Sequence, residues 1–273
     1  MNRELIDRVV QSLLYEGHLL YPYRSSALKN RLRFNYGVVY PPACAGESNT
    51  MRTECIVVAG AAAKLGVDAR FLQVIEHNGN YETLERTIHI DAPGLLPQRA
   101  TFEFAPIRGD LELDVMQCAE SAFRIRVQII NQSQPAGAEL LQSLISTHTI
   151  LVAEAGEFVS SIDPPDYLRE AVAACQNIGT WPVLIGDVGS HDCMLSSPII
   201  LYDYPQLAPE TAGDFYDATE IEELLALRIL TLADDEKQEL RTGDDRARKL
   251  VNRIESLPSE SLMKLHGALR GKS

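Results

Sequence analysis

Two periodicities of hydrophobic positions divide the chain. In residues 2–15, apolar side chains come in adjacent pairs that repeat every four positions, which predicts an amphipathic helix. From about residue 51 to 205, apolar and polar residues alternate instead, most strictly at 111–115 (LELDV) and 123–129 (FRIRVQI). Alternation with a period of two is typical of strands with one buried face. The pattern therefore predicts a helix followed by a β-rich body.

The body contains further short runs that favour strands. Turn residues separate most of these runs, and few helical patterns lie between them, so an antiparallel sandwich or barrel is favoured over a parallel nucleotide-binding sheet. Short helices are expected near 137–145 and 165–175. The strand-like runs of the body are 55–58, 67–75, 87–90, 100–104, 147–152 and 197–205, and a further short run at 34–40 precedes the body.

The last quarter of the chain returns to helical patterns. Thr219 to Glu222 have the spacing of a capping box and precede a leucine-rich stretch, and two more helices are expected at 234–256 and 259–270. The predicted class is α+β: an antiparallel β-sandwich-like body with an N-terminal helix and a C-terminal helical segment. The expected parts are 1–50 (helix and basic aromatic arm), 51–205 (β-rich body) and 206–273 (acidic helical segment).

Charge narrows the classes of partner. The net charge is −13, which opposes binding to nucleic acid and to anionic membrane surfaces. Residues 1–36 nevertheless carry six basic against three acidic residues, whereas 203–239 carry eleven acidic against two basic residues. Opposite charges at the two ends favour a contact within the chain or between subunits.

The sequence shows no sign of export. Charged residues interrupt the N-terminus where a signal peptide needs an apolar core, and no run reaches the roughly 18 apolar residues of a membrane span. The five cysteines are far apart and have no C-x-x-C spacing, so we expect free thiols rather than disulfides. A cytoplasmic protein is predicted.

The clearest candidate for partner binding is a basic aromatic arm. It mixes aromatic and cationic side chains, the types enriched at protein interfaces. Alternatives are packing against the acidic C-terminal segment of the same chain and anion binding by Arg24 and Lys29 with Ser25 and Ser26. The arm residues are Tyr21, Tyr23, Arg24, Lys29, Arg31, Arg33 and Phe34.

A metal site is the main competing hypothesis. His191 and Cys193 flank Asp192, and Asp214 and Asp217 follow in an acidic stretch, so ligand types for a divalent metal are present. The alternative is a purely structural role. His191 and Cys193 would then form a polar turn with the thiol entering the core, and the carboxylates would stabilise a helix N-terminus. His89 and His148 are interpreted as hydrogen-bonded structural imidazoles. The common hydrolase, zincin and nucleotide-binding motifs are absent from the sequence.

Three stretches of sequence resemble an uncharacterised bacterial family associated with gene neighbourhoods of [NiFe] hydrogenases. They are Tyr21 to Arg31, Gly179 to Pro182, and Met194 to Pro205 continuing through Ala208 to Ile221. The resemblance implies an accessory or assembly role, with a hydrogenase or its maturation factor as partner, and it supplies no catalytic residue.

We therefore expect a non-enzymatic accessory protein that acts through protein–protein contacts, without a cofactor. The alternatives are a metal-binding protein or metal-dependent enzyme that uses His191, Cys193 and the acids at 210–220, and a self-assembling structural protein that forms a homo-oligomer.

Overall fold

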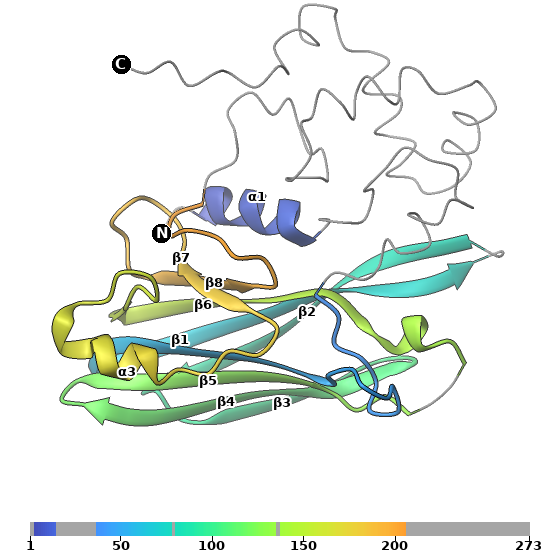
Figure 1. Cartoon of the computed structure of the whole chain (residues 1–273), viewed down its shortest axis with the longest axis horizontal. Coiled ribbons are helices and arrows are strands. Elements are labelled where there is room, and N and C mark those ends of the chain that lie inside the picture. Colours follow the sequence, from blue (N-terminus) through green and yellow to red (C-terminus); the bar gives the residue numbers. More distant parts are fainter. Residues whose placement is uncertain (1–2, 15–36, 78–79, 135–136, 206–273) are drawn as a thin grey trace, which may run out of the picture.

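The computed structural model describes residues 3–14, 37–77, 80–134 and 137–205, and the fold is taken from these (Figure 1). Their dominant feature is a single antiparallel sheet of eight strands with few helices. The strands are β1 (Thr50–His77), β2 (Asn80–Pro93), β3 (Gln98–Phe104), β4 (Ile107–Ala119), β5 (Ala122–Asn131), β6 (Leu144–Phe158), β7 (Trp181–Leu184) and β8 (Cys193–Ser197). The helices are α1 (Arg3–Leu14), the 3-10 turns η1 (Glu139–Gln142) and η2 (Asp166–Leu168), and α3 (Arg169–Ala173).

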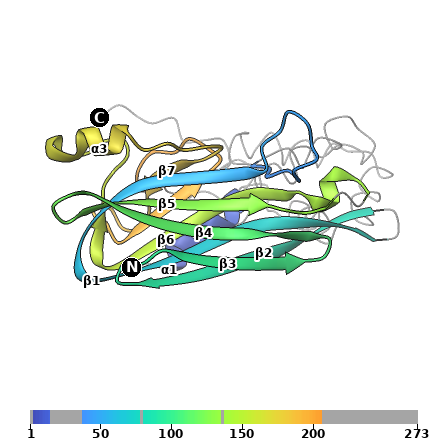
Figure 2. The same cartoon turned by 90° about the horizontal axis from the view of Figure 1, so that it is seen from below.

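The 28-residue strand β1 organises the sheet. One of its edges pairs with β6. The other edge pairs with β5 over Thr50–Val58 and then with β2 over Lys64–His77. The sheet therefore branches along β1, and the strand order is β3-β4-β5-β1-β6-β8-β7 with β2 paired to β1 outside this path. Figure 2, the view from below, shows β5, β4 and β3 side by side with α1 behind them.

The branch point coincides with a run of small residues. Between Ala59 and Lys64 the register with β6 shifts, at the sequence Ala59-Gly60-Ala61-Ala62-Ala63. An irregularity of this kind bends a strand, and small side chains allow neighbouring backbones to come close at the bend. The bend lets the two halves of β1 belong to different parts of a nearly closed, barrel-like sheet.

Side chains from both branches meet in one core. Alternate residues of β1, including Leu65, Val67, Ala69 and Phe71, are buried against apolar residues of β4, β5 and β6. The Phe71, Phe102 and Phe104 rings lie within about 6 Å of one another, at 5.9, 6.0 and 6.1 Å between centroids. Aromatic pairs at this separation add to the stability that burial provides.

A buried amide ties the second half of β1 to the β3–β4 turn. The Nε2 of Gln73 donates to the carbonyl oxygens of Phe104 and Ala105, at 2.9 and 3.0 Å. Arg86 of β2 donates to the Gln73 Oε1, and its guanidinium stacks over the Phe104 ring. This contact brings β1, β2 and the β3–β4 turn together.

Helix α1 packs on the outward face of the sheet. Ile6, Val9, Val10 and Leu13 form a second apolar cluster with residues of β6 and β8. Ser146 donates its hydroxyl to the Leu13 carbonyl near the end of the helix. The amphipathic stripe therefore does bury one face, as the sequence predicted, and Figure 1 shows the helix lying over β6 and β8.

The β-rich antiparallel body is confirmed, while the predicted sandwich is confirmed only in part because the strands belong to one branched sheet. The short helices also form close to where they were predicted. The separate runs 55–58 and 67–75 belong to one strand, β1, whose pairing with β6 resumes at Lys64 after the register shift that follows Ala59.

The prediction of a strand at 197–205 is wrong. Strand β8 ends at Ser197, because Pro198 has no N–H to offer a ladder. Asp203 instead accepts the N–H of Leu184 and the hydroxyl of Ser160. In the described part of 34–40, Val39 forms only an isolated bridge, to Leu144. The predicted helices beyond residue 205 lie outside the described residues. Among the residues that are described, no helix is long and apolar enough to cross a membrane.

Candidate functional site

A groove of about 530 Å³ lies beside α1 on the outward face of β2, β1 and β6. Its residues come from five elements that are distant in sequence. They are Ile6 and Asp7 of α1; Lys64, Leu65, Gly66, Asp68 and Arg70 of β1; His89, Asp91, Ala92 and Pro93 of β2; Ile150, Val152 and Glu154 of β6; and Cys193 of β8.

Strand alternation explains why the groove is polar. On β1, Lys64, Gly66, Asp68 and Arg70 alternate with residues that are buried in the core, so the polar set points outward. The antiparallel register then places Asp68 opposite His89, and Gly66 opposite Asp91. Two adjacent strands thus bring a carboxylate and an imidazole into direct cross-strand contact.

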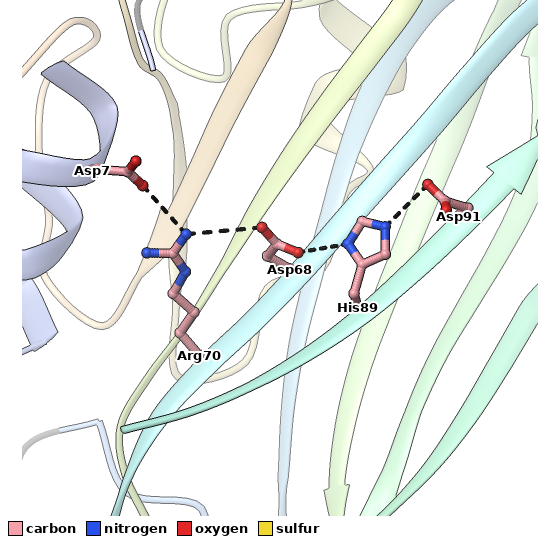
Figure 3. A network of polar contacts seen from close by, with 5 residues as sticks. All are labelled: Asp7, Asp68, Arg70, His89 and Asp91. Carbon is pink, nitrogen blue, oxygen red and sulfur yellow. Dashed lines mark hydrogen bonds and ion pairs between the residues drawn. The ribbon is translucent and has the colours of Figure 1, made fainter. Parts of the chain in front are cut away.

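Five of these side chains form a continuous chain of opposite charges (Figure 3). The Nδ1 of His89 lies 2.6 Å from Asp68 Oδ1, and its Nε2 lies 3.0 Å from Asp91 Oδ1. The other oxygen of Asp68 is 3.9 Å from the Arg70 guanidinium, which also contacts Asp7 of α1 at 3.3 Å. The network therefore links the helix to both strands of the hairpin.

The two carboxylates favour the charged form of His89. The hydrogen bond to Asp68 raises the pKa of His89 above its ordinary value, and Asp91 acts in the same direction, while partial burial opposes both. With a carboxylate at each ring nitrogen, the protonated imidazolium donates one hydrogen bond to each. His89 is half exposed, at 54%, so the charge can respond to the solvent or to a bound molecule.

An apolar floor lies beside this charged row. Ile150 and Val152 of β6 and Cys193 of β8 line it together with Ile6 of α1. Gly66 leaves the β1 backbone without a side chain between the charged pairs. A Cβ added there would meet only His89 Cε1 at 3.7 Å and Asp91 Oδ1 at 4.0 Å, which are ordinary contacts. Apart from these two side chains and the adjacent residues of the chain, no atom of a described residue lies within 4 Å of that position.

A second histidine lies opposite Arg70 in the β1–β6 register. His148 is 1% exposed, and its Nδ1 donates to the Ser146 carbonyl at 2.8 Å. Burial lowers the pKa of His148 to about 4, and the neighbouring Arg70 charge contributes to this effect. This imidazole is therefore neutral and structural, as the sequence suggested.

The structure separates the predicted metal ligands His191 and Cys193. His191 directs its Nδ1 to the Phe158 carbonyl at 2.8 Å and lines a different, more open hollow near the β1 bend. Cys193 is buried at the floor of the first groove, and burial raises the pKa of its thiol to about 12. Within the described ranges, no three His, Cys, Asp or Glu side chains group as metal ligands. Asp214 and Asp217 lie outside those ranges, so a site that includes them stays a prediction.

The basic aromatic arm is also outside the described residues. Its partner-binding residues stay a prediction; they are Tyr21, Tyr23, Arg24, Lys29, Arg31, Arg33 and Phe34.

Sequence reasoning missed the groove. The available signals were the pairs Asp68 with Arg70 and His89 with Asp91, each two residues apart within a strand-like run. Such spacing marks the outward face of a strand, but it does not reveal which two strands are neighbours. Only the β1–β2 register joins the pairs.

Comparison with known proteins adds no family to this description. A scan against protein-family models gives no match, and a search of curated proteins also gives none. The link to hydrogenase gene neighbourhoods therefore remains an expectation that rests on the resemblance alone.

Proposed function

We propose that the protein is a non-enzymatic accessory protein that binds part of another protein in the groove between α1 and strands β2, β1 and β6. The observation that carries this proposal is the groove of about 530 Å³ that Gly66 lines, bordered by a charged row on one side and apolar residues on the other. Binding sites in proteins commonly combine an apolar surface with a few fixed polar groups.

The charged row is well suited to binding because its own contacts hold it in place. Asp68 bridges His89 and Arg70, and Arg70 also contacts Asp7, so few side chains would have to be ordered when a partner arrives. Ordering a flexible side chain at an interface costs about 0.5–1.5 kcal/mol, and a preorganised site avoids much of that cost.

The size of the groove limits what part of a partner it can hold. A volume of about 530 Å³ lies within the range of sites for small molecules or a few side chains. We propose that the groove receives a short segment of the partner, with neighbouring surfaces adding further contact. The resemblance supplies the identity to test first: a hydrogenase or one of its maturation factors.

The decisive variant is Gly66→Leu, which fills the groove without removing any charged side chain. Gly60→Leu is the matched control because Gly60 is on the same strand, has no described atom within 4 Å of an added Cβ, and lines the second hollow at the β1 bend rather than this groove. Full-length wild-type and variant proteins would be immobilised and exposed to native host extract. Quantitative mass spectrometry would identify bound proteins, and calorimetry with the purified partner would follow.

We expect Gly66→Leu to weaken binding of the purified partner at least tenfold and Gly60→Leu to leave it unchanged. Thermal unfolding of both variants would show that they are folded. Equal affinity of the wild type and Gly66→Leu for every specific partner would contradict the proposal.

A further inference from the structure

From the unused hydrogen-bonding capacity of the groove, we infer that its ligand is an ammonium or guanidinium group carried on an apolar stem. This inference rests on the proposed function and specifies the chemistry that the groove recognises. The cation could belong to a lysine or arginine side chain of the partner or to a free organic amine, and the experiment below separates these two sources.

The cations of the groove are largely occupied by its own carboxylates. Both ring nitrogens of His89 are paired, Arg70 contacts two aspartates, and Lys64 lies 3.5 Å from Glu154. The exposed carboxylates are less fully used. Asp7, Asp91 and Glu154 each engage one oxygen, and their second oxygens have no hydrogen bond or ion pair to another described residue. The groove therefore has free acceptor oxygens on Asp7, Asp91 and Glu154 that face solvent, whereas the unpaired Nε of Arg70 is buried and cannot reach a ligand.

The spare oxygens belong to three separate elements. Asp7 comes from α1, Asp91 from β2 and Glu154 from β6, and all three border the same groove. Their side chains are 51%, 82% and 71% exposed, so an incoming group can reach them from solvent. Hydrogen bonds between ionised groups are stronger than neutral ones. A group with several N–H donors and a positive charge fits this arrangement.

Charge balance points the same way. Among the described lining residues, four carboxylates stand against Lys64, Arg70 and His89, so their negative charge is in excess by one even when His89 is protonated. An anionic ligand would have to approach a cation that already has a carboxylate beside it, whereas a cation can add to the carboxylates as they stand.

The floor distinguishes an organic cation from a metal ion. Val152 and Pro93 offer accessible apolar contact next to the carboxylates, whereas Ile6 and Ile150 are already buried in the cluster beneath α1. A bare metal ion would make no use of this surface, and no group of three metal ligands occurs in the described part of the chain. An alkyl or aromatic stem that packs on Val152 and Pro93 would be removed from water together with their exposed surface, which is favourable.

The test measures binding of two small probes to the full chain. The probes, 2-phenylethylammonium and 3-phenylpropanoate, share a phenylethyl group and have opposite charge. We expect the ammonium probe to bind with a dissociation constant in the range of about 1 mM, since weak affinity is usual for so small a ligand. The carboxylate probe should bind at least tenfold more weakly. Amide and methyl chemical-shift changes should be centred on Gly66, Asp91 and Val152.

Single substitutions test the acceptor groups. Asp91→Asn and Glu154→Gln should each weaken binding of the ammonium probe about threefold or more. Glu103→Gln should leave this binding unchanged, because Glu103 is an exposed carboxylate on β3 outside the groove. Raising the salt concentration to about 0.5 M should weaken the ammonium probe further, since salt screens exposed charges.

Two blocked tripeptides, Leu-Arg-Leu and Leu-Gln-Leu, identify the source of the cation. Binding of Leu-Arg-Leu at least tenfold tighter than the ammonium probe, with Leu-Gln-Leu weak, would assign the cation to a partner side chain. Equal affinity of the Arg peptide and the ammonium probe would assign it to a free amine.

The inference is overturned if both small probes bind equally, or if Asp91→Asn and Glu154→Gln leave the ammonium affinity unchanged. In either case, loss of partner binding in Gly66→Leu would still support the proposed function, so the two failures are distinguishable.

Discussion

The imidazole of His89 faces the carboxylate of Asp68 across the β1–β2 ladder, with Nδ1 and Oδ1 2.6 Å apart. Asp68 also contacts Arg70, and Asp91 occupies the other ring nitrogen of His89. One cross-strand pair thus joins two strands to α1 through Arg70 and Asp7. The protonation state of His89 therefore bears on both the stability of the hairpin and the charge of the groove.

We expect His89 to titrate above about 6.5, the ordinary value for histidine. A raised folded-state pKa adds stability that is fully present below about pH 6.5 and is lost as the pH rises through the folded-state pKa. Because His89 is half exposed, this contribution should be less than about 1 kcal/mol. Titration of the ring Cε1 proton by NMR measures the pKa directly, and Asp68→Asn should lower it. His148, with a pKa of about 4, is the internal reference and should stay neutral from pH 5.5 to 8.

The same substitution at two glycines of the sheet should change the free energy of unfolding by very different amounts. Gly66→Ala adds a methyl group that meets only His89 and Asp91 atoms at ordinary contact distances, so the free energy of unfolding should change by no more than about 0.5 kcal/mol. Gly109→Ala on β4 would drive a methyl group against the Ile130 carbonyl oxygen and the Phe102 ring, and should cost at least about 2 kcal/mol. Urea unfolding of both variants gives the comparison. A loss of unfolding free energy well below about 2 kcal/mol in Gly109→Ala would show that the β4 and β5 backbones do not pack closely at Gly109.

Asp110 should make the protein sensitive to acid. This carboxylate is 1% exposed and accepts hydrogen bonds from Arg99, Thr101 and Gln132. The hydrogen bond from Arg99 lowers the pKa of Asp110 most, and it outweighs the effect of burial. A lowered folded-state pKa gives stability that is present above about pH 3.9, the ordinary value, and is lost as the pH falls through the folded-state pKa.

Removing that charge should reproduce the effect at neutral pH. Asp110→Asn should lower the free energy of unfolding by about 1–3 kcal/mol at pH 7 because hydrogen bonds to a charged group are lost. The difference from wild type should shrink as the pH approaches 3. Asp114→Asn on the same strand, at an exposed position, is the control. Chemical unfolding across the pH range measures both, and a difference independent of pH would contradict the assignment.

The buried amide of Gln73 should be required for the closure of the barrel-like sheet. Gln73→Met retains the length of the side chain but removes the donors to Phe104 and Ala105 and the acceptor for Arg86. Leaving buried polar groups unpaired costs about 1–3 kcal/mol. Gln117→Met, at an exposed position of β4, should change stability by less than about 0.5 kcal/mol. Hydrogen exchange at the β3–β4 turn should rise only in the first variant.

The cysteines should differ in their reaction with iodoacetamide. Cys118 is exposed, whereas Cys55 and Cys193 are buried, and burial raises the pKa of both buried thiols. Because the thiolate is the reacting form, Cys118 should be labelled first at pH 8, and the buried pair should react only on unfolding. Mass spectrometry of timed samples gives the order. Rapid labelling of Cys193 in the native protein would show that α1 opens away from the groove floor.

The sequence determined those features that depend on local pattern. Alternation over residues 123–129 sufficed to predict a strand, and the paired apolar positions of 2–15 sufficed to predict α1, because the spacing of residues on one face is a property of the backbone alone. The expectation that His148 is hydrogen-bonded is confirmed at Nδ1, whereas its buried Nε2 has no partner among the described residues.

The tertiary structure alone decided which of these elements are neighbours. The branch of β1 from β5 to β2 depends on a bend at Ala59 to Ala63, and the contact of Asp68 with His89 depends on one register out of several that the alternation allows. Strand pairing is set by how side chains from distant segments fill a common core, and a pattern within one segment contains no information about that. The groove and its charged row therefore depend on the β1–β2 register that this packing stabilises.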